Sequence, residues 1–185
     1  MAELKTLLGP QFEDEDDDEL PEIIGSCGSF LTLRGDIIYF LHQSAKDFLL
    51  TKTVGQVLPS GLAYQHELIF ERSLQALSET LRRDICQLSH PGFNINDVSP
   101  GVLEPLHPIG YSCVYWVDHL HDSEYTSIKN HLKDGGNIHI FIRKKYLYWL
   151  ESLSLLRSTI EGVKATNKLE YLATVSCLQH IWKVI

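Results

Sequence analysis

Apolar residues recur every three or four positions over residues 62–86, and polar residues fill the positions between them. Steps of four, three, four and four separate the members of this series, which are Phe70, Leu74, Leu77, Leu81 and Ile85. Such spacing places all of them on one side of an α-helix with 3.6 residues per turn. The pattern therefore predicts an amphipathic helix that ends near residue 86 and buries this stripe.

Further helices are predicted downstream. Residues 111–121 and 123–133 have short helical patterns, and Gly135-Gly136 ends the second. The longest apolar series contains Ile142, Tyr146, Trp149, Leu153, Leu156 and Ile160. A last helix, starting near Thr166, has apolar positions at Leu169, Leu172, Ile181 and Ile185. With the helix at 62–86, these segments predict about five helices.

Residues 88–110 interrupt the helical pattern. The breakers in this stretch are Pro91, Pro100, Pro105, Pro108, Gly92, Gly101 and Gly110. Because proline lacks the N–H that helices and sheets require, no regular element is expected here. The stretch is predicted to be a long connection that packs over the helices.

A β-hairpin is predicted near the N-terminal end. The β-rich runs 30–34 and 37–42 flank Gly35-Asp36, which suits a two-residue turn because glycine tolerates positive φ. Residues 43–51 then change to helical spacing, with Ser44 as the expected cap. A unit of about 30 residues is too small to fold alone, so it must pack against another surface.

The N-terminal part of the chain is strongly acidic. The 185-residue chain has a formal net charge of −8, and seven consecutive acidic residues at 13–19 supply most of it. Because like charges at this density resist packing, residues 1–20 are predicted to form a disordered acidic arm. The remainder is nearly neutral, and the basic cluster at 143–145 is interpreted as a solvated helix face. A nucleic-acid partner is therefore not expected.

Composition indicates an ordinary soluble protein. Hydrophobic residues make up 44% of the chain, and no run reaches the roughly 18 uncharged apolar residues of a membrane helix. A signal-peptide pattern is missing, so a cytoplasmic location without a membrane partner is expected. Cys27, Cys86, Cys113 and Cys177 include no C-x-x-C pair, and they are interpreted as reduced core thiols.

The chain is predicted to be non-enzymatic. It contains no G-x-x-x-x-G-K-[ST], G-x-S-x-G or H-E-x-x-H segment, so no catalytic residue and no metal site are assigned. His119 and His121 are two positions apart on a helix and point in different directions, so they are interpreted as polar surface residues rather than zinc ligands. Cys27, His42 and Asp47 could form a thiol triad, but single residues of these types occur in most chains.

Two segments resemble part of a known family. Residues 27–34 (CGSFLTLR) and 39–50 (YFLHQSAKDFLL) are similar to the winged-helix segment of fungal NACHT-type signalling NTPases, which are related to vegetative (heterokaryon) incompatibility factors. The similarity extends over roughly residues 21–172 and continues through 81–85, 91–93, 111–120 and 145–156. It implies a partial winged helix at 21–58 and a helical connector at 59–185, between a nucleotide-binding domain and a WD or ankyrin repeat sensor.

The resemblance also implies one functional residue. His42 occupies the histidine position of the F-x-H-x-S motif (residues 40–44), which in NACHT proteins contacts the phosphates of bound ADP in the resting state. An imidazole N–H suits this task because it can donate to a phosphate oxygen. ATP exchange would then release the winged helix. Without a P-loop in this chain, the simpler interpretation is that His42 ends a strand and satisfies a local backbone group.

The expected fold is mainly α, with a winged-helix-like hairpin and helix followed by a helical bundle. The expected function is a regulatory or scaffold fragment of a fungal NACHT NTPase, with its nucleotide-binding and repeat partners in cis or in trans. ADP or ATP is implied for the intact family protein and no cofactor for this chain. The alternative is a winged-helix DNA-binding protein, whose recognition helix at 44–51 would contain one lysine and one aspartate.

Overall fold

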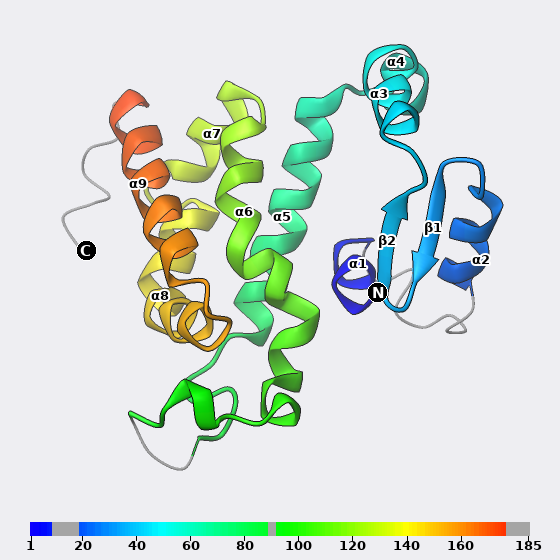
Figure 1. Ribbon diagram of the computed structural model, residues 1–185. Coiled ribbons are helices and arrows are strands. Elements are labelled where there is room, and N and C mark those ends of the chain that lie inside the picture. Colours follow the sequence, from blue (N-terminus) through cyan, green and yellow to red (C-terminus); the bar gives the residue numbers. More distant parts are fainter. Residues whose placement is uncertain (9–18, 89–91, 177–185) are drawn as a thin grey trace.

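The computed structural model describes residues 1–8, 19–88 and 92–176, and the fold is mainly α-helical (Figure 1). A two-stranded antiparallel hairpin precedes a helical bundle, which confirms the predicted fold class. In chain order the elements are α1 (Ala2–Leu8), α2 (Glu19–Ser26), β1 (Leu31–Arg34), β2 (Ile37–Phe40), α3 (Gln43–Thr51), α4 (Val54–Val57), α5 (Leu62–Thr80), η2 (Ile95–Asp97), η3 (Pro100–Ile109), α6 (Gly110–Asp122), α7 (Tyr125–Leu132), α8 (Asn137–Leu155) and α9 (Thr159–Val175). None of the helices in these described stretches is both long and apolar enough to cross a bilayer.

The hairpin and its following helix form where they were predicted. β1 and β2 pair in the register that leaves Gly35 and Asp36 as the turn, and Gly35 has a φ of +60°. Glycine adopts this conformation without a steric penalty. The N-cap of α3 is His42 rather than the predicted Ser44. The strand pairing extends to Leu41, whose N–H donates to the carbonyl of Phe30, so the helix begins directly after it.

The first residues form a helix rather than part of a disordered arm. At the start of α6, the Glu3 carboxylate accepts a hydrogen bond from the backbone N–H of Tyr111 at 2.7 Å. Arg72 of α5 donates to the carbonyl of Leu7 at 2.6 Å, near the end of α1. The negative carboxylate lies at the start of α6 and the positive guanidinium lies near the end of α1. The helix dipole favours both arrangements. The rest of the predicted arm, residues 9–18, lies outside the described residues, and α2 was not predicted.

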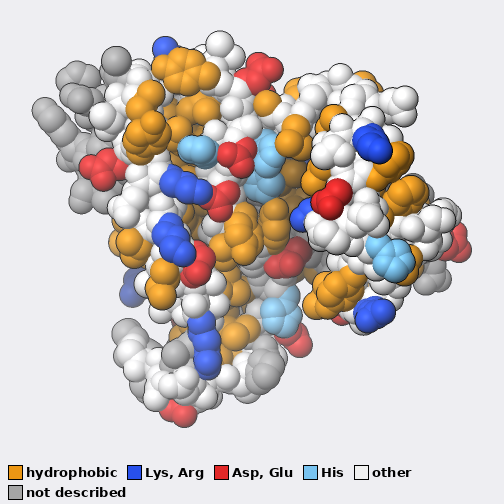
Figure 2. Space-filling view, turned by 45° about the horizontal axis from the view of Figure 1, so that its top comes forward, with side chains coloured by type: hydrophobic (Ala, Val, Ile, Leu, Met, Phe, Trp, Pro, Cys, Tyr) orange, Lys and Arg blue, Asp and Glu red, His pale blue; other side chains and the backbone are white. Residues whose placement is uncertain are grey.

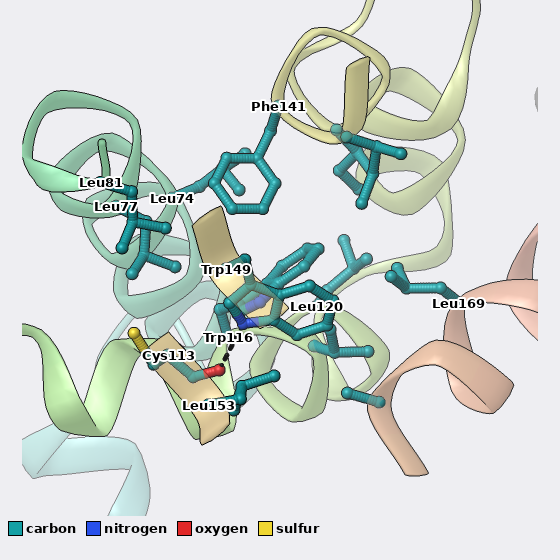
Figure 3. Packing of buried hydrophobic residues seen from close by; sticks show 14 of the residues in the cluster. Leu74, Leu77, Leu81, Cys113, Trp116, Leu120, Phe141, Trp149, Leu153 and Leu169 are labelled. Atoms are coloured by element: carbon teal, nitrogen blue, oxygen red, sulfur yellow. Dashed lines mark hydrogen bonds between the residues drawn. The ribbon is translucent and has the colours of Figure 1, made fainter. Parts of the chain in front are cut away.

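The bundle packs around an aromatic centre (Figure 3). Trp116 of α6 and Trp149 of α8 are fully buried, with ring centroids 5.5 Å apart in an edge-to-face arrangement. Phe141 contacts Trp116 in the same way at 5.4 Å. The indole N–H of Trp149 donates to the carbonyl of Cys113 at 2.8 Å, which compensates for its burial. α6 lies between α5 and α9 (Figure 1).

The α5 helix ends six residues before the predicted position. The backbone of Leu81 is extended, and Lys145 of α8 donates to its carbonyl at 2.6 Å. Lys145 is therefore partly buried, whereas the cluster at 143–145 was predicted to be solvated. Leu81 and Ile85 are nevertheless buried, so both occupy core positions although the backbone there is not helical. Apolar spacing identified the core residues but could not locate the helix end.

Part of the predicted connection at 88–110 is a regular element. Pro100–Ile109 form the 3-10 helix η3, with Pro105 and Pro108 inside it. Proline fixes φ near −65°, which lies within the range of a 3-10 helix. Residues three apart align in this helix type, so Leu106 and Ile109 are both buried. The prediction of an irregular segment was wrong here.

The predicted apolar series over 142–160 spans two helices. α8 ends at Leu155, Arg157 has a φ of +57°, and α9 begins at Thr159, seven residues before its predicted start. The left-handed residue reverses the chain, so Ile160 belongs to α9 and is exposed. The last two apolar positions of the final predicted helix lie outside the described residues.

Candidate functional site

His42 lies on the surface of the hairpin unit, which comprises residues 19–58. Its backbone carbonyl accepts hydrogen bonds from Ala45 and Lys46 at 3.0 and 3.5 Å, and these bonds start α3. The side chain is exposed and makes no capping hydrogen bond to the helix. Its ring N–H is thus available to donate to a phosphate oxygen.

Apolar side chains are exposed in the segments that precede and follow this histidine in the chain. The set comprises Ile37, Tyr39, Phe40, Leu41, Phe48 and Leu50, and it is named the hairpin surface below. Only Leu20 and Ile24 are buried among the described residues of the unit, so the unit has almost no core of its own. Figure 2 shows hydrophobic side chains at the surface of the lobe that this unit forms on the right.

The structure does not bring Cys27, His42 and Asp47 together as a hydrogen-bonded triad. Asp47 accepts a hydrogen bond from Gln43 at 3.0 Å, and among the described residues no hydrogen bond links Cys27, His42 and Asp47. Cys27 is exposed, which corrects its prediction as a core thiol, because it follows the end of α2. The other described cysteines are Cys86 and Cys113, both buried. Cys177 lies outside the described residues.

Burial suppresses the reactivity of the two core thiols. It raises the pKa of Cys113 to about 12 and also raises the pKa of Cys86, to which the charges of Glu151 and Asp84 contribute. A thiol with a raised pKa is protonated near neutral pH and is a poor nucleophile. These two cysteines therefore serve packing rather than chemistry.

His119 is buried, which corrects its interpretation as a surface residue. Nδ1 of His119 lies 2.9 Å from Nδ1 of His66 on α5, and its Nε2 lies 2.7 Å from the hydroxyl of Tyr111. His121, two positions later, is exposed and contacts Asp122. The two histidines point in different directions, as predicted, but the side chain of His119 points into the bundle.

The buried histidine is held in its neutral form. Burial lowers the pKa of His119, and the charge of His66 acts in the same direction, against the smaller opposing effects of Asp118 and Asp122. The two Nδ1 atoms share one proton, and Nε2 of His119 pairs with the Tyr111 hydroxyl. Both ring nitrogens of His119 therefore have a hydrogen-bond partner while the ring stays uncharged. The network therefore joins α5 to α6, and protonation would disturb it.

A further polar cluster consists of Glu67 and Glu71 on α5 and His131 on α7. One potential ligand atom from each residue lies within 4.8 Å of the others. The spacing of the glutamates places both on one side of α5, which the sequence could have indicated. His131 follows sixty positions after Glu71, so only the packing of α7 brings it to this side.

Comparisons with known proteins identify a relative for most of the chain. No protein-family profile and no solved structure matches it. The chain is 45% identical to the vegetative incompatibility protein HET-E-1 of Podospora anserina. The alignment covers 188 residues, 93% of this chain and 14% of HET-E-1, so the chain spans about one seventh of that protein. This similarity supports a related family.

Proposed function

We propose that the chain is a non-catalytic regulatory module of a fungal incompatibility-type signalling protein. The similarity to HET-E-1 over 93% of the chain supports the protein class. Docking of the hairpin unit onto a NACHT-type nucleotide-binding domain, in cis or in trans, is the finer proposal. The observation that carries it is the hairpin surface, whose six apolar side chains, before and after His42 in the chain, are 42–57% exposed. Exposed apolar clusters of this kind are typical of interfaces.

Docking would bury the hairpin surface and bring His42 to the phosphates of ADP. The apolar contacts would supply most of the affinity, and the imidazole would make the complex sensitive to the nucleotide. Exchange of ADP for ATP changes the position and charge of the phosphates, so the docked state would lose this contact. The module would thereby pass the nucleotide state to a WD or ankyrin repeat region.

The α1 helix offers a route from the hairpin unit to the bundle. The N-terminal amine of Met1 donates to the carbonyl of Asp36 in the hairpin turn at 2.8 Å. The same helix contacts α5 and α6 through Arg72 and Tyr111. A displacement of the hairpin would therefore act directly on helices of the bundle.

The test measures binding of the full chain to a recombinant fungal NACHT domain loaded with ADP or with a non-hydrolysable ATP analogue. We expect tighter binding to the ADP form, and His42→Ala should reduce this preference about tenfold, as loss of a charged hydrogen bond would. Phe48→Ser should weaken binding to both forms. His107→Ala, an exposed histidine outside the hairpin unit, serves as the control. Equal binding of wild type and His42→Ala to the ADP form would contradict the role of His42.

An ATPase assay of the isolated chain separates the regulatory class from the enzymatic one. We expect no turnover above buffer, because the sequence contains no P-loop motif. Turnover that disappears in His42→Ala would instead identify an enzyme. Retention of the chain on a DNA duplex column at low salt would favour the winged-helix DNA-binding alternative.

A further inference from the structure

Three side chains with metal-ligand chemistry meet between α5 and α7. His131 Nε2 lies 3.8 Å from Glu67 Oε1 and 3.7 Å from Glu71 Oε1. Both distances are too long for hydrogen bonds. They are slightly longer than the roughly 3.3–3.6 Å that separates two ligand atoms of one tetrahedral ion bound at about 2.0–2.2 Å from each. The spacing of the three groups therefore suits a shared cation.

His131 is the least exposed member of the cluster. The residue is 9% exposed, and its ring packs edge-on against Phe70 with centroids 4.8 Å apart. No hydrogen bond to its side chain is found within the described part of the chain, where the two carboxylates are its polar neighbours. Coordination of an ion by Nε2 would give this ring a partner within bonding distance.

The carboxylates have the support and the access that a metal site requires. The hydroxyl of Ser127 on α7 donates to Glu67 Oε1 and orients this carboxylate, as outer-shell groups do around metal ions. The Glu71 side chain is 48% exposed, so an ion and its remaining water ligands can enter beside it. Glu71 also borders a groove of about 360 Å³ that extends to Asn137 and Ile140.

We propose that Glu67, Glu71 and His131 bind a divalent first-row transition-metal ion, with Zn²⁺ as the best match. Carboxylate oxygen and imidazole nitrogen are both zinc ligands, whereas Mg²⁺ and Ca²⁺ prefer oxygen ligands alone. The positive ion offsets the charges of the two carboxylates. Water completes its coordination on the open side, and the ion ties the short α7 helix to α5.

The direct test titrates the metal-stripped full chain with Zn²⁺ by calorimetry and with Co²⁺ by visible absorption. We expect one Co²⁺ bound with the spectrum of a nitrogen and oxygen site, and Zn²⁺ should displace it. Glu71→Gln should weaken binding at least tenfold, and it keeps the shape of a half-exposed side chain. Glu79→Gln on the same helix is the matched control and should bind as wild type. Ser127→Ala should weaken binding about tenfold through the orientation of Glu67.

A thermal readout distinguishes this site from metal bound elsewhere. Zn²⁺ at about 100 times its Kd should raise the melting temperature of the wild type by roughly 5–10 °C. The same shift is expected for Glu79→Gln and is lost in Glu71→Gln. No binding to the folded wild type would overturn the proposal. Equal affinity in wild type and Glu71→Gln would also overturn it, because it would indicate an adventitious ion only, held by thiols or other histidines.

Discussion

The helical bundle and the hairpin unit use their apolar residues in opposite ways. In the bundle, apolar side chains from α5 to α9 form one buried cluster around Trp116 and Trp149. In the hairpin unit, strands and a helix form with correct turn chemistry, yet the hairpin surface stays exposed. Local hydrogen bonds and a suitable turn define the conformation of a hairpin, but they do not stabilise it in water without a surface to pack on.

This difference separates the residues that stabilise the fold from those that are exposed on its surface. The bundle buries its own apolar stripes, so its stability should depend on core packing and helix ends. The hairpin unit accepts a hydrogen bond from the Met1 amine but has little buried area, so its residues should matter more for association than for folding. Substitutions in the two regions test this division.

Removal of a central indole should have the largest effect. Trp149→Ala is expected to lower the free energy of unfolding by about 3–5 kcal/mol, because it leaves a cavity and removes the bond to the Cys113 carbonyl. Urea denaturation followed by far-UV circular dichroism measures this loss. Leu147→Ala, 74% exposed on the same helix, should stay within about 0.5 kcal/mol of wild type. Similar losses in both variants would mean that the aromatic centre does not stabilise the bundle.

The end of α5 provides the next test. Lys145→Met should cost about 1–2 kcal/mol, because the charged hydrogen bond to the Leu81 carbonyl is lost at a partly buried position. Its exposed neighbour offers a matched control, since Lys144→Met removes the same charge and is expected to be nearly neutral. The same urea titration compares the two variants. A loss in Lys144→Met as large as in Lys145→Met would assign the effect to net charge.

Stability should fall in mildly acidic solution because of His119. Its pKa is lowered in the native state, whereas the unfolded chain has the ordinary value of 6.5. As pH falls below 6.5, the unfolded state therefore binds its proton first. The stabilisation is present above pH 6.5 and is lost as pH falls through the lowered native pKa, by at most about 1.4 kcal/mol per pH unit.

Two histidine variants isolate this dependence in urea titrations at several pH values. His119→Gln should flatten the slope of stability against pH just below 6.5. His121→Gln removes the exposed histidine of the same helix and should leave the slope as in wild type. An unchanged slope in His119→Gln would show that another group produces the acid sensitivity.

The smallest effect on folding is expected in the hairpin surface. Phe48→Ser should change the free energy of unfolding by no more than about 0.5 kcal/mol, because the ring is 42% exposed and contributes no buried core. Phe141→Ser in the bundle makes the same chemical change at a buried position and should cost several times more. A large loss in Phe48→Ser would show that the hairpin unit is stabilised within the chain and does not need a partner.

The sequence predicted most elements because local rules determine them. Gly35-Asp36 defined the turn, and the apolar spacing of α5 and α8 identified residues that are buried. The errors lie where packing overrides local rules. α8 ends at Leu155 and is followed by the left-handed Arg157, and the proline-rich η3 becomes regular because its apolar residues can reach the bundle.

Candidate sites were harder to predict because they depend on residues far apart in the chain. Only a family resemblance pointed to His42, which lies on the surface of the hairpin unit. The contacts of His119 with His66 and of His131 with two glutamates join separate helices. The spacing of residues along one helix cannot reveal such pairs, because the partner residue lies on another helix.

By itself, the sequence determined which segments are amphipathic, where the hairpin turns, and the absence of a P-loop motif, because these features depend on neighbouring residues. The tertiary structure alone decided where helices end and which polar groups are buried. Lys145 reaches the Leu81 carbonyl only when α8 packs against α5, and a side chain at Gly162 of α9 would force the side chain of Leu153 to shift. Such contacts arise from helix packing, where residues distant in sequence become neighbours.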